Sequence, residues 1–247
     1  MDSWALLYFS LMVVIATAVQ TITGFALGLI LVALCTAFGV MSVIDCAAIV
    51  SLVSMMNTGL LLRRSYRDLN GHVVMAIMLG LIPTLLLGFY WLDQVGRDQL
   101  SLLRTIIGAM VLVAGMTLML RPSPYSSLSA KPFFFGSGLI GGLFGGLFSA
   151  AGAPIAYLMY RQPLAISVIR SSLLAVFFLS TFVRAVTGGF AGHYTPDVLI
   201  KTLVAAPVML VTTMLIEPTL PAIPDQVVRR LVFLCLMALG LYLLLAP

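Results

Sequence analysis

Hydrophobic residues fill most of the chain, and the few polar clusters divide them into segments long enough to cross a bilayer. One crossing needs about 20 apolar residues, and six runs meet that length as ordinary spans. They lie at residues 43–62, 73–92, 100–120, 166–183, 198–216 and 231–246. Two further stretches, Ala5–Phe38 and Phe133–Tyr160, carry no formal charge. The first of these is too long for one span and too short for two comfortable ones.

Each of these two charge-free stretches is broken near its middle by small or polar residues. The first break is Gln20-Thr21-Ile22-Thr23-Gly24, and the second is formed by Ser149 and Gly152-Ala153-Pro154. Hydrophobic segments interrupted at corresponding positions of two halves are typical of transporters, whose binding sites lie at the interruptions. The pattern therefore predicts a protein that moves a small solute across a membrane.

The composition excludes a soluble domain. The chain is 62% hydrophobic and 9% charged, with a mean hydropathy of +1.16, whereas a soluble domain carries roughly a quarter charged residues. The net charge of +5 belongs to loops between spans, where it sets orientation, so it gives no support to nucleic-acid binding. Cys35, Cys46 and Cys235 lie in apolar runs without metal-type spacing, and we expect them to be small buried hydrophobic residues.

The two halves of the chain match each other on either side of a polar, proline-punctuated linker. Ser42-Val43-Ile44-Asp45 corresponds to Ser167-Val168-Ile169-Arg170, and Gly24 is matched with Gly152. Matches that recur in the same order indicate an internal repeat. The organisation that we expect is an N-terminal transmembrane repeat at residues 1–121, a linker at 122–131 and a C-terminal transmembrane repeat at 132–247.

The basic residues indicate how the two repeats are oriented. If each broken stretch crosses the membrane once, the 13 basic residues divide almost evenly between the two sides. If each broken stretch instead turns back, as a helical hairpin or as two short spans, nine of them share one side, as the positive-inside tendency expects. These nine are Arg63, Arg64, Arg67, Arg121, Lys131, Arg161, Arg170, Arg229 and Arg230. We therefore expect inverted repeats with both termini outside.

Arg170 is the charged residue best suited to bind an anion. A guanidinium group offers a planar fork of donors that matches carboxylate, sulfite or sulfonate oxygens, and a charge within a span usually faces the protein interior. The alternative is that Arg170 extends to the membrane interface along its apolar stem. Asp45, its counterpart in the other repeat, is a candidate to pair with Arg170 or to carry a coupled proton; the alternative for Asp45 is a plain helix N-cap or an acid in the first turn of a helix.

The breaks supply the second group of candidates. Their polar side chains offer hydrogen bonds to an anion, and half-helix N-termini just after Gly24 and Gly152 would direct backbone N–H groups to the same place. The alternative is that small residues only allow close helix packing, which is how we interpret Gly138, Gly142 and Gly146 at every fourth position. Asn57 either lines the pathway or holds helices together. The substrate-binding candidates are Gln20, Thr21, Thr23, Gly24, Phe25, Asn57, Ser149, Gly152, Pro154, Tyr157, Arg170 and Ser171.

Three motifs carry a resemblance to a known family. The run Val19–Leu27 resembles the Thr-Gly-Phe signature that opens many members of the sulfite exporter TauE/SafE family of membrane transporters. Gly141–Phe148, which leads into Gly152-Ala153-Pro154, is similar to the family's glycine-rich run ending in Gly-Pro-Pro. Arg170-Ser171-Ser172 resembles the Arg-x-[ST] start of the next span. The likeness covers nearly the whole chain, including its two-repeat plan.

This resemblance implies export or import of sulfite, sulfonates or related organic anions. Ala151 and Ala153 stand where the family commonly has glycine, and Ala26 replaces a frequent glycine after Thr-Gly-Phe. These departures bear on the shape of the binding site and therefore on the identity of the substrate.

The fold class that we predict is an all-α polytopic membrane protein. It has two inverted repeats, each a Gly/Pro-broken helical segment plus three transmembrane helices, with about eight spans by hydropathy and up to ten helical segments. We expect a multi-pass protein of a bacterial inner membrane that transports a small anion, such as sulfite or the organosulfonate sulfoacetate, bound between the broken helices. The alternative is an intramembrane enzyme or assembly factor with re-entrant helices.

The expected partners are the small anionic substrate and the lipid bilayer. We expect no nucleic acid, no cofactor, no metal and no enzymatic activity. The sequence leaves the oligomeric state, the direction of transport and the coupling ion open.

Overall fold

The computed structural model describes residues 3–95, 100–119, 125–218, 234 and 237–245, and these residues form helices and turns with no strand. The helices in chain order are α1 Ser3–Thr23, α2 Leu27–Ala37, α3 Val43–Ser65, the short 3-10 helix η1 Tyr66–Asp68, α4 Gly71–Val95, α5 Leu100–Met119, α6 Lys131–Phe148, α7 Gly152–Met159, α8 Ile166–Phe190 and α9 Pro196–Ile216. Residues 237–245 are also helical. The prediction of an all-α protein is confirmed.

Four of the six predicted spans, 43–62, 73–92, 166–183 and 198–216, coincide with α3, α4, α8 and α9, whereas the span predicted at 100–120 coincides with α5, whose apolar part Ser101–Met116 is shorter. Five described helices are long and apolar enough to cross a membrane, namely α1, α3, α4, α8 and α9. The predicted span at 231–246 is described only at residues 234 and 237–245, which are helical. Cys235 and four of the basic residues used to infer orientation lie outside the described residues; these four are Arg97, Arg121, Arg229 and Arg230.

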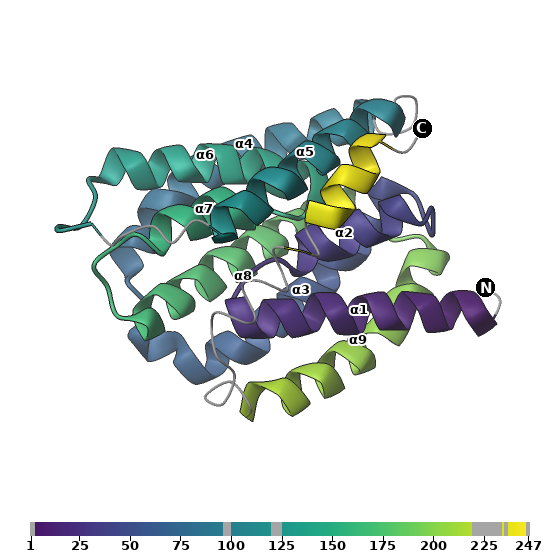
Figure 1. Cartoon of the computed structure of the whole chain (residues 1–247), viewed down its shortest axis with the longest axis horizontal. Helices are drawn as coiled ribbons and strands as arrows, with labels where there is room; N and C mark the ends of the chain where they lie inside the picture. The colour runs from purple at the N-terminus through teal and green to yellow at the C-terminus, as the bar shows by residue number, and fades with distance from the viewer. Residues whose placement is uncertain (1–2, 96–99, 120–124, 219–233, 235–236, 246–247) are drawn as a thin grey trace.

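Both broken stretches turn back on themselves. Figure 1 shows α2 running back along the molecule after α1, and α7 running back after α6. Left-handed backbone makes the turns possible: Gly24 has φ 78° and Ala26 has φ 85° in the first break, and Ser149 has φ 56° in the second. Neither stretch is therefore a single continuous helix.

The glycine stripe of α6 packs directly on α4. A Cβ atom added at Gly138, Gly142 or Gly146 would come within about 2 Å of a backbone carbonyl oxygen of α4, on Ile77, Leu81 or Leu85 respectively. A contact below 3.0 Å is impossible for a real Cβ atom, so only glycine lets the two backbones approach this closely. The interpretation of these glycines as a packing surface is confirmed.

Helix pairs in the two halves mirror one another with exchanged partners. The first half of the chain contributes α1 to a contact with α9, and the second half contributes α6 to a contact with α4. In the same way α3 packs on α9 while α8 packs on α4, and α3 and α8 pack on each other at the centre. The start of α1 and the last of the helical residues 237–245 lie on the same side of the molecule (Figure 1).

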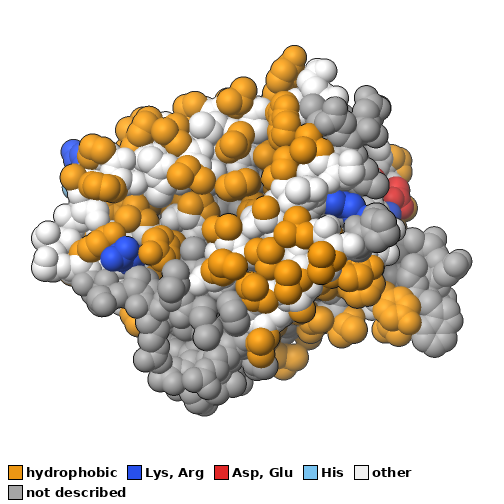
Figure 2. Space-filling model, turned by 45° about the horizontal axis from the view of Figure 1, so that its top comes forward, with side chains coloured by type: hydrophobic (Ala, Val, Ile, Leu, Met, Phe, Trp, Pro, Cys, Tyr) orange, Lys and Arg blue, Asp and Glu red, His pale blue; other side chains and the backbone are white. Residues whose placement is uncertain are grey.

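Polar contacts tie the loops together at each end of the helices. At one end, the Tyr125 amide donates to the Arg161 carbonyl at 2.7 Å, and the Arg161 guanidinium lies 4.3 Å from the centre of the Tyr125 ring. At the other end, Nε2 of His193 lies 3.1 Å from Oδ1 of Asp93. In Figure 2, hydrophobic side chains cover the middle of the visible face, and the visible charged side chains lie toward its two ends. This arrangement is that of a multi-pass membrane protein.

Candidate functional site

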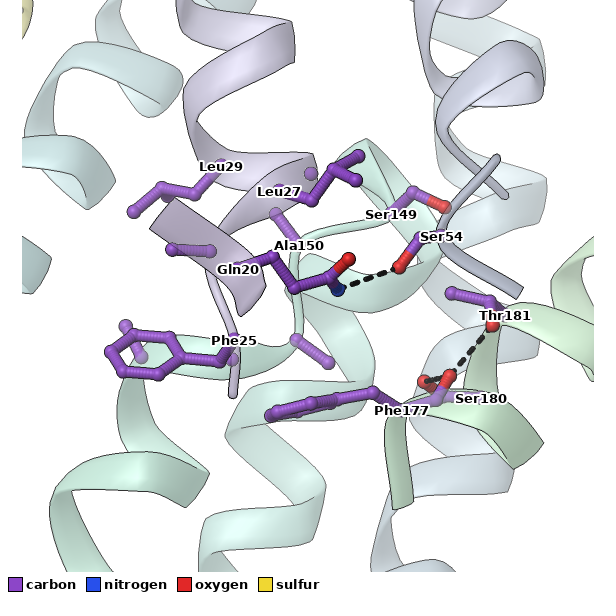
Figure 3. Close-up of a pocket in the computed structure, with 15 residues that line it drawn as sticks. Gln20, Phe25, Leu27, Leu29, Ser54, Ser149, Ala150, Phe177, Ser180 and Thr181 are labelled. Atoms are coloured by element: carbon purple, nitrogen blue, oxygen red, sulfur yellow. Dashed lines mark hydrogen bonds between the residues drawn. The ribbon is translucent and has the colours of Figure 1, made fainter. Parts of the chain in front are cut away.

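The two breaks meet at one small cavity inside the helices. Its volume is about 20 Å³, which is room for about one water molecule. Figure 3 shows residues of both breaks around this space, together with polar side chains of α3 and α8. The lining residues are Gln20, Phe25, Ala26, Leu27, Gly28, Leu29, Ser54, Ser149, Ala150, Ala151, Gly152, Ala153, Phe177, Ser180 and Thr181.

The N-termini of the two half-helices, α2 and α7, both face this cavity. Leu27, Gly28 and Leu29 form the first turn of α2, and Gly152 and Ala153 begin α7. Backbone N–H groups in the first turn of a helix have no acceptor within the helix, and neither helix has a side chain that caps it. The two N-termini therefore present unpaired donors and the positive ends of two helix dipoles to one place.

The two breaks also touch each other directly. A Cβ atom at Gly28 would lie 2.2 Å from the carbonyl oxygen of Ser149, and a Cβ atom at Gly152 would lie 2.9 Å from Cδ2 of Phe25. Gly24 and Ser149 each follow the last residue of the first helix of a broken stretch, α1 or α6, and share the left-handed conformation. Ser149 is thus the structural counterpart of Gly24, and the sequence match of Gly24 with Gly152 is shifted by three residues.

A chain of buried hydrogen bonds ends at the cavity. The Thr213 hydroxyl donates to Oδ1 of Asn57 at 2.7 Å, Nδ2 of Asn57 donates to Oε1 of Gln20 at 2.6 Å, and Nε2 of Gln20 donates to the Ser54 hydroxyl oxygen at 3.0 Å. Because Ser54 accepts from Gln20, its own proton is left to point elsewhere. The chain therefore orients one hydroxyl donor in the cavity wall.

Three other hydroxyl groups lie in the wall of the cavity. Ser180 and Thr181 of α8 both bond the carbonyl oxygen of Phe177, at 3.0 and 2.7 Å. The hydroxyl of Ser149 is buried and has no hydrogen-bond partner. A buried polar group without a partner costs roughly 1–3 kcal/mol, so a ligand or water at this point would relieve a real deficit.

The structure places four of the sequence candidates in the wall of the cavity, namely Gln20, Phe25, Ser149 and Gly152. Asn57 acts one step back, through Gln20. The Thr21 hydroxyl lies 3.5 Å from the Thr213 hydroxyl. The Thr23 hydroxyl is used locally, because it lies within hydrogen-bond distance of the carbonyl oxygens of Val19 and Phe25 in its own break.

Arg170 lies beside the first break rather than in the cavity. Its Nη2 donates to the Thr21 carbonyl at 2.7 Å, and its Cγ would lie 3.5 Å from a Cβ atom at Gly24. The Nε atom is buried and has no partner. The guanidinium group therefore holds the end of α1, and its Nε–H donor remains without an acceptor.

The remaining candidates stand outside the cavity wall. Pro154 occupies the first turn of α7, where its missing N–H would have had no acceptor. The Tyr157 hydroxyl accepts from Nη1 of Arg161 at 3.4 Å. Ser171 is buried. Ser42 caps α3, since its hydroxyl oxygen accepts from the Asp45 amide at 3.0 Å, and Asp45 is an acid of the first turn, whose carboxylate accepts from the Ser42 hydroxyl at 2.7 Å. The structure does not bring Asp45 and Arg170 together.

Sequence reasoning did not select Phe177, Ser180, Thr181 or Arg184. The signal for the hydroxyl pair was its place inside a predicted span. Arg184 was used only to count charges on the two sides, although a charge inside a span is itself a functional signal. Among the described residues, no group of three His, Cys, Asp or Glu side chains lies close enough to hold a metal ion.

Comparisons with known proteins show which family the chain resembles. The family model described as "Sulfite exporter TauE/SafE" matches residues 9–243. A protein of Cupriavidus necator described as "Probable sulfite/organosulfonate exporter TauE" is 31% identical over 229 residues, which cover 93% of this chain and 90% of that protein. No solved structure matches the chain.

Proposed function

The chain belongs to the sulfite exporter TauE/SafE family, and from this premise we propose that it carries sulfite or a small organosulfonate such as sulfoacetate across a bacterial inner membrane. The family is one of membrane transporters, and the multi-pass helical fold agrees with that activity. The observation that carries the proposal is the convergence of two half-helix N-termini on one buried cavity lined by hydroxyl groups.

The substrate oxygens would bind to donors from both halves of the protein. Backbone N–H groups at the start of α2 and α7 suit an anion, because each helix N-terminus carries about half a positive charge. The hydroxyls of Ser54 and Ser149 supply side-chain donors. The Ser54 hydroxyl oxygen accepts from Gln20, which leaves its proton to donate, and the Ser149 hydroxyl has no hydrogen-bond partner among the described residues. A sulfite or sulfonate headgroup has three oxygens around one sulfur, so it can accept from several of these donors at once.

The volume of the cavity indicates that binding is coupled to movement of the breaks. A space of about 20 Å³ holds about one water molecule, which is less than a sulfur atom with three oxygens needs. The contact between Gly28 and the Ser149 carbonyl joins the two breaks across the cavity. We expect these two segments to separate when the anion binds, as in transporters whose repeats move around a central site.

We further propose that residues 1–121 and 132–247 are inverted repeats around the linker at 122–131. The exchanged helix pairs, α1 with α9 and α6 with α4, support this relation. Arg63 and Arg64 lie in the last turn of α3 and Arg67 lies in η1, at the end of the molecule where Arg161 precedes α8. Two bonds support this placement: Arg64 bonds Glu217, which follows α9, and the Asn70 amide donates to the hydroxyl of Ser172 near the start of α8. This basic end would face the cytoplasm.

Anion flux in liposomes tests the proposed function, with two serines of one helix as a matched pair. Ser54 lines the cavity, whereas Ser51 lies one turn earlier, is also buried, and donates to the Ala48 carbonyl at 2.7 Å. A hydrogen bond to a charged group contributes about 1.5–3 kcal/mol. Ser54→Ala should therefore weaken sulfite binding by roughly ten- to a hundredfold, while Ser51→Ala should leave it unchanged.

The measurements are sulfite efflux from liposomes that contain the purified protein and equilibrium binding of sulfite to the same preparation. Absence of sulfite, sulfoacetate and methanesulfonate flux for the unmodified protein would reject the proposed function. Equal affinities for the two serine variants would reject the cavity as the place where the anion binds.

A further inference from the structure

Arg184 is a fully buried charge inside the helix bundle. It belongs to α8, and only 1% of its surface is exposed. Charged side chains in a membrane span are costly unless they face a partner or a pathway. The position of Arg184 thus requires a compensating group.

The groups that contact Arg184 are neutral. Its Nε donates to the Gly146 carbonyl at 3.0 Å and its Nη1 donates to the Ala47 carbonyl at 2.9 Å. The guanidinium carbon lies 5.4 Å from the centre of the Phe89 ring. Nη2 is buried and has no hydrogen-bond partner. Carbonyl dipoles and one aromatic face stabilise the cation but leave its net charge in place.

The described part of the chain supplies no carboxylate for this charge. Its ion pairs join Arg64 to Glu217, His193 to Asp93 and Lys201 to Asp197, and Asp45 is bonded to Ser42. Tyr194 packs nearby and donates to the Ala185 carbonyl at 2.9 Å. Burial raises the pKa of the Tyr194 hydroxyl, so this group stays neutral as well.

Arg184 lies about one helical turn from residues that line the cavity, both along α8 and through its partner on α6. On α8 it follows the lining residues Ser180 and Thr181 by four and three positions, which places them on neighbouring turns of one face. On α6 its partner Gly146 precedes the lining residue Ser149 in the same turn. A positive charge that no acid among the described residues neutralises is thus held next to a cavity rich in donors.

We propose that Arg184 is the residue that makes this site select anions, because the substrate itself supplies the missing counter-charge. The inference rests on the proposed function and deepens it. Arg184 acts as a positioning residue: its charge attracts the anion across one turn of protein, and its bonds to the Gly146 and Ala47 carbonyls hold α3, α6 and α8 around the cavity. Its ligand class is any small oxoanion, and uncharged molecules of the same shape are excluded.

The size of the effect follows from Coulomb's law. Unit charges about 8–12 Å apart, at an effective dielectric constant of about 20, attract each other enough to change a dissociation constant roughly ten- to thirtyfold. Removing the charge of Arg184 should therefore weaken anion binding by about that factor. Removing the charge of Arg64, whose side chain is 60% exposed, should change it little, because solvent and salt screen a surface charge.

The experiment compares charge with hydrogen bonding at this one position. Binding of methanesulfonate and of sulfite to the purified, lipid-reconstituted protein is measured by calorimetry for the unmodified protein, Arg184→Lys, Arg184→Gln and the surface control Arg64→Gln. The melting temperature without ligand is measured for each. We expect Arg184→Lys to keep anion affinity within about threefold, Arg184→Gln to lose roughly ten- to thirtyfold, and Arg64→Gln to match the unmodified protein.

A second variant keeps the test open if Arg184→Gln does not fold. Cys46→Asp places a carboxylate beside Ala47, whose carbonyl Arg184 bonds, and within electrostatic range of that guanidinium. An internal counter-ion should reduce anion affinity as strongly as loss of the charge. Unchanged affinity in Arg184→Gln or Cys46→Asp, alongside a lower melting temperature, would show that Arg184 is only a structural link and overturn the inference. Failure of the unmodified protein to bind either anion would instead reject the proposed function.

Discussion

Gly28 offers a direct test of the contact between the two breaks. A Cβ atom at this position would lie 2.2 Å from the Ser149 carbonyl oxygen, 3.0 Å from its carbonyl carbon and 3.1 Å from Cγ1 of Val50. Two of these neighbours are backbone atoms, which cannot rotate away as the end of a side chain can. Gly28→Ala should therefore push α2 and the second break apart by about 1 Å.

The cost of this change can be estimated from packing and hydrogen-bond energies. Overpacking lowers the stability by about 1–3 kcal/mol, and alanine is up to about 1 kcal/mol more favourable than glycine in a helix. The added methyl group would also occupy part of the space that opens between the breaks when the anion binds, so the anion would lie about 1 Å farther from one set of donors, beyond the hydrogen-bond range of 2.7–3.2 Å. An anion held by both breaks would then lose at least one charge-assisted bond, which corresponds to a roughly ten- to hundredfold lower affinity.

Gly142→Ala is the control, since it introduces a clash of the same size away from the cavity. Its Cβ atom would lie 2.2 Å from both the Leu81 carbonyl oxygen and the Thr84 hydroxyl oxygen, between α4 and α6. Melting temperature and sulfite affinity are measured for both variants. We expect both to be less stable and only Gly28→Ala to bind sulfite weakly. Normal sulfite affinity in folded Gly28→Ala would refute the reasoning that the breaks jointly hold the anion.

Three further predictions concern topology, Arg170 and the buried hydrogen-bond chain. Single cysteines at Tyr66 and Ala165, in a protein without the native cysteines, should be labelled from the same side of the membrane, and one at Ala191 from the other; labelling of Tyr66 and Ala165 from opposite sides would contradict the inverted repeats. Should Arg170 bind the substrate, Arg170→Lys should bind the anion poorly and Arg170→Ala roughly ten- to hundredfold more weakly than the unmodified protein, and near-normal affinity of the lysine variant would remove it from the site. Asn57→Leu leaves Gln20 and the Thr213 hydroxyl without their partner, so the free energy of unfolding should fall by roughly 2–6 kcal/mol; a calorimetric scan that shows no change would mean that water replaces the lost bonds.

The sequence predicted the breaks well because they depend on local chemistry. Runs of apolar residues mark the helices, and the polar and small residues at Gln20–Gly24 and at Ser149–Pro154 mark their interruption. Packing along the stripe of α6 was also accessible, because it needs only small residues at helical spacing. The register of the breaks was not predictable, since Ser149 takes the left-handed conformation of a helix C-cap, a position where glycine or asparagine is usual.

The α8 helix shows why the rest of the site could not be read from the sequence. Its predicted span ended at residue 183, just before Arg184, because a charge normally marks the end of a span. The helix continues to Phe190 because the carbonyls of Gly146 and Ala47, distant in sequence, satisfy the guanidinium. The partner of Arg170 was hidden for the same reason, because the Thr21 carbonyl is a backbone group of another helix.

The central claim is that a small oxoanion binds between the two half-helix N-termini, and locating a bound anion tests it most directly. Selenite, the selenium analogue of sulfite, can be placed in crystals of the protein by anomalous diffraction at the selenium edge. We expect one selenium peak placed so that the oxygens around it lie within hydrogen-bond distance of the first-turn amides of α2 and α7 and of the Ser54 hydroxyl. A peak elsewhere, or none in crystals of protein that binds selenite in solution, would contradict the account.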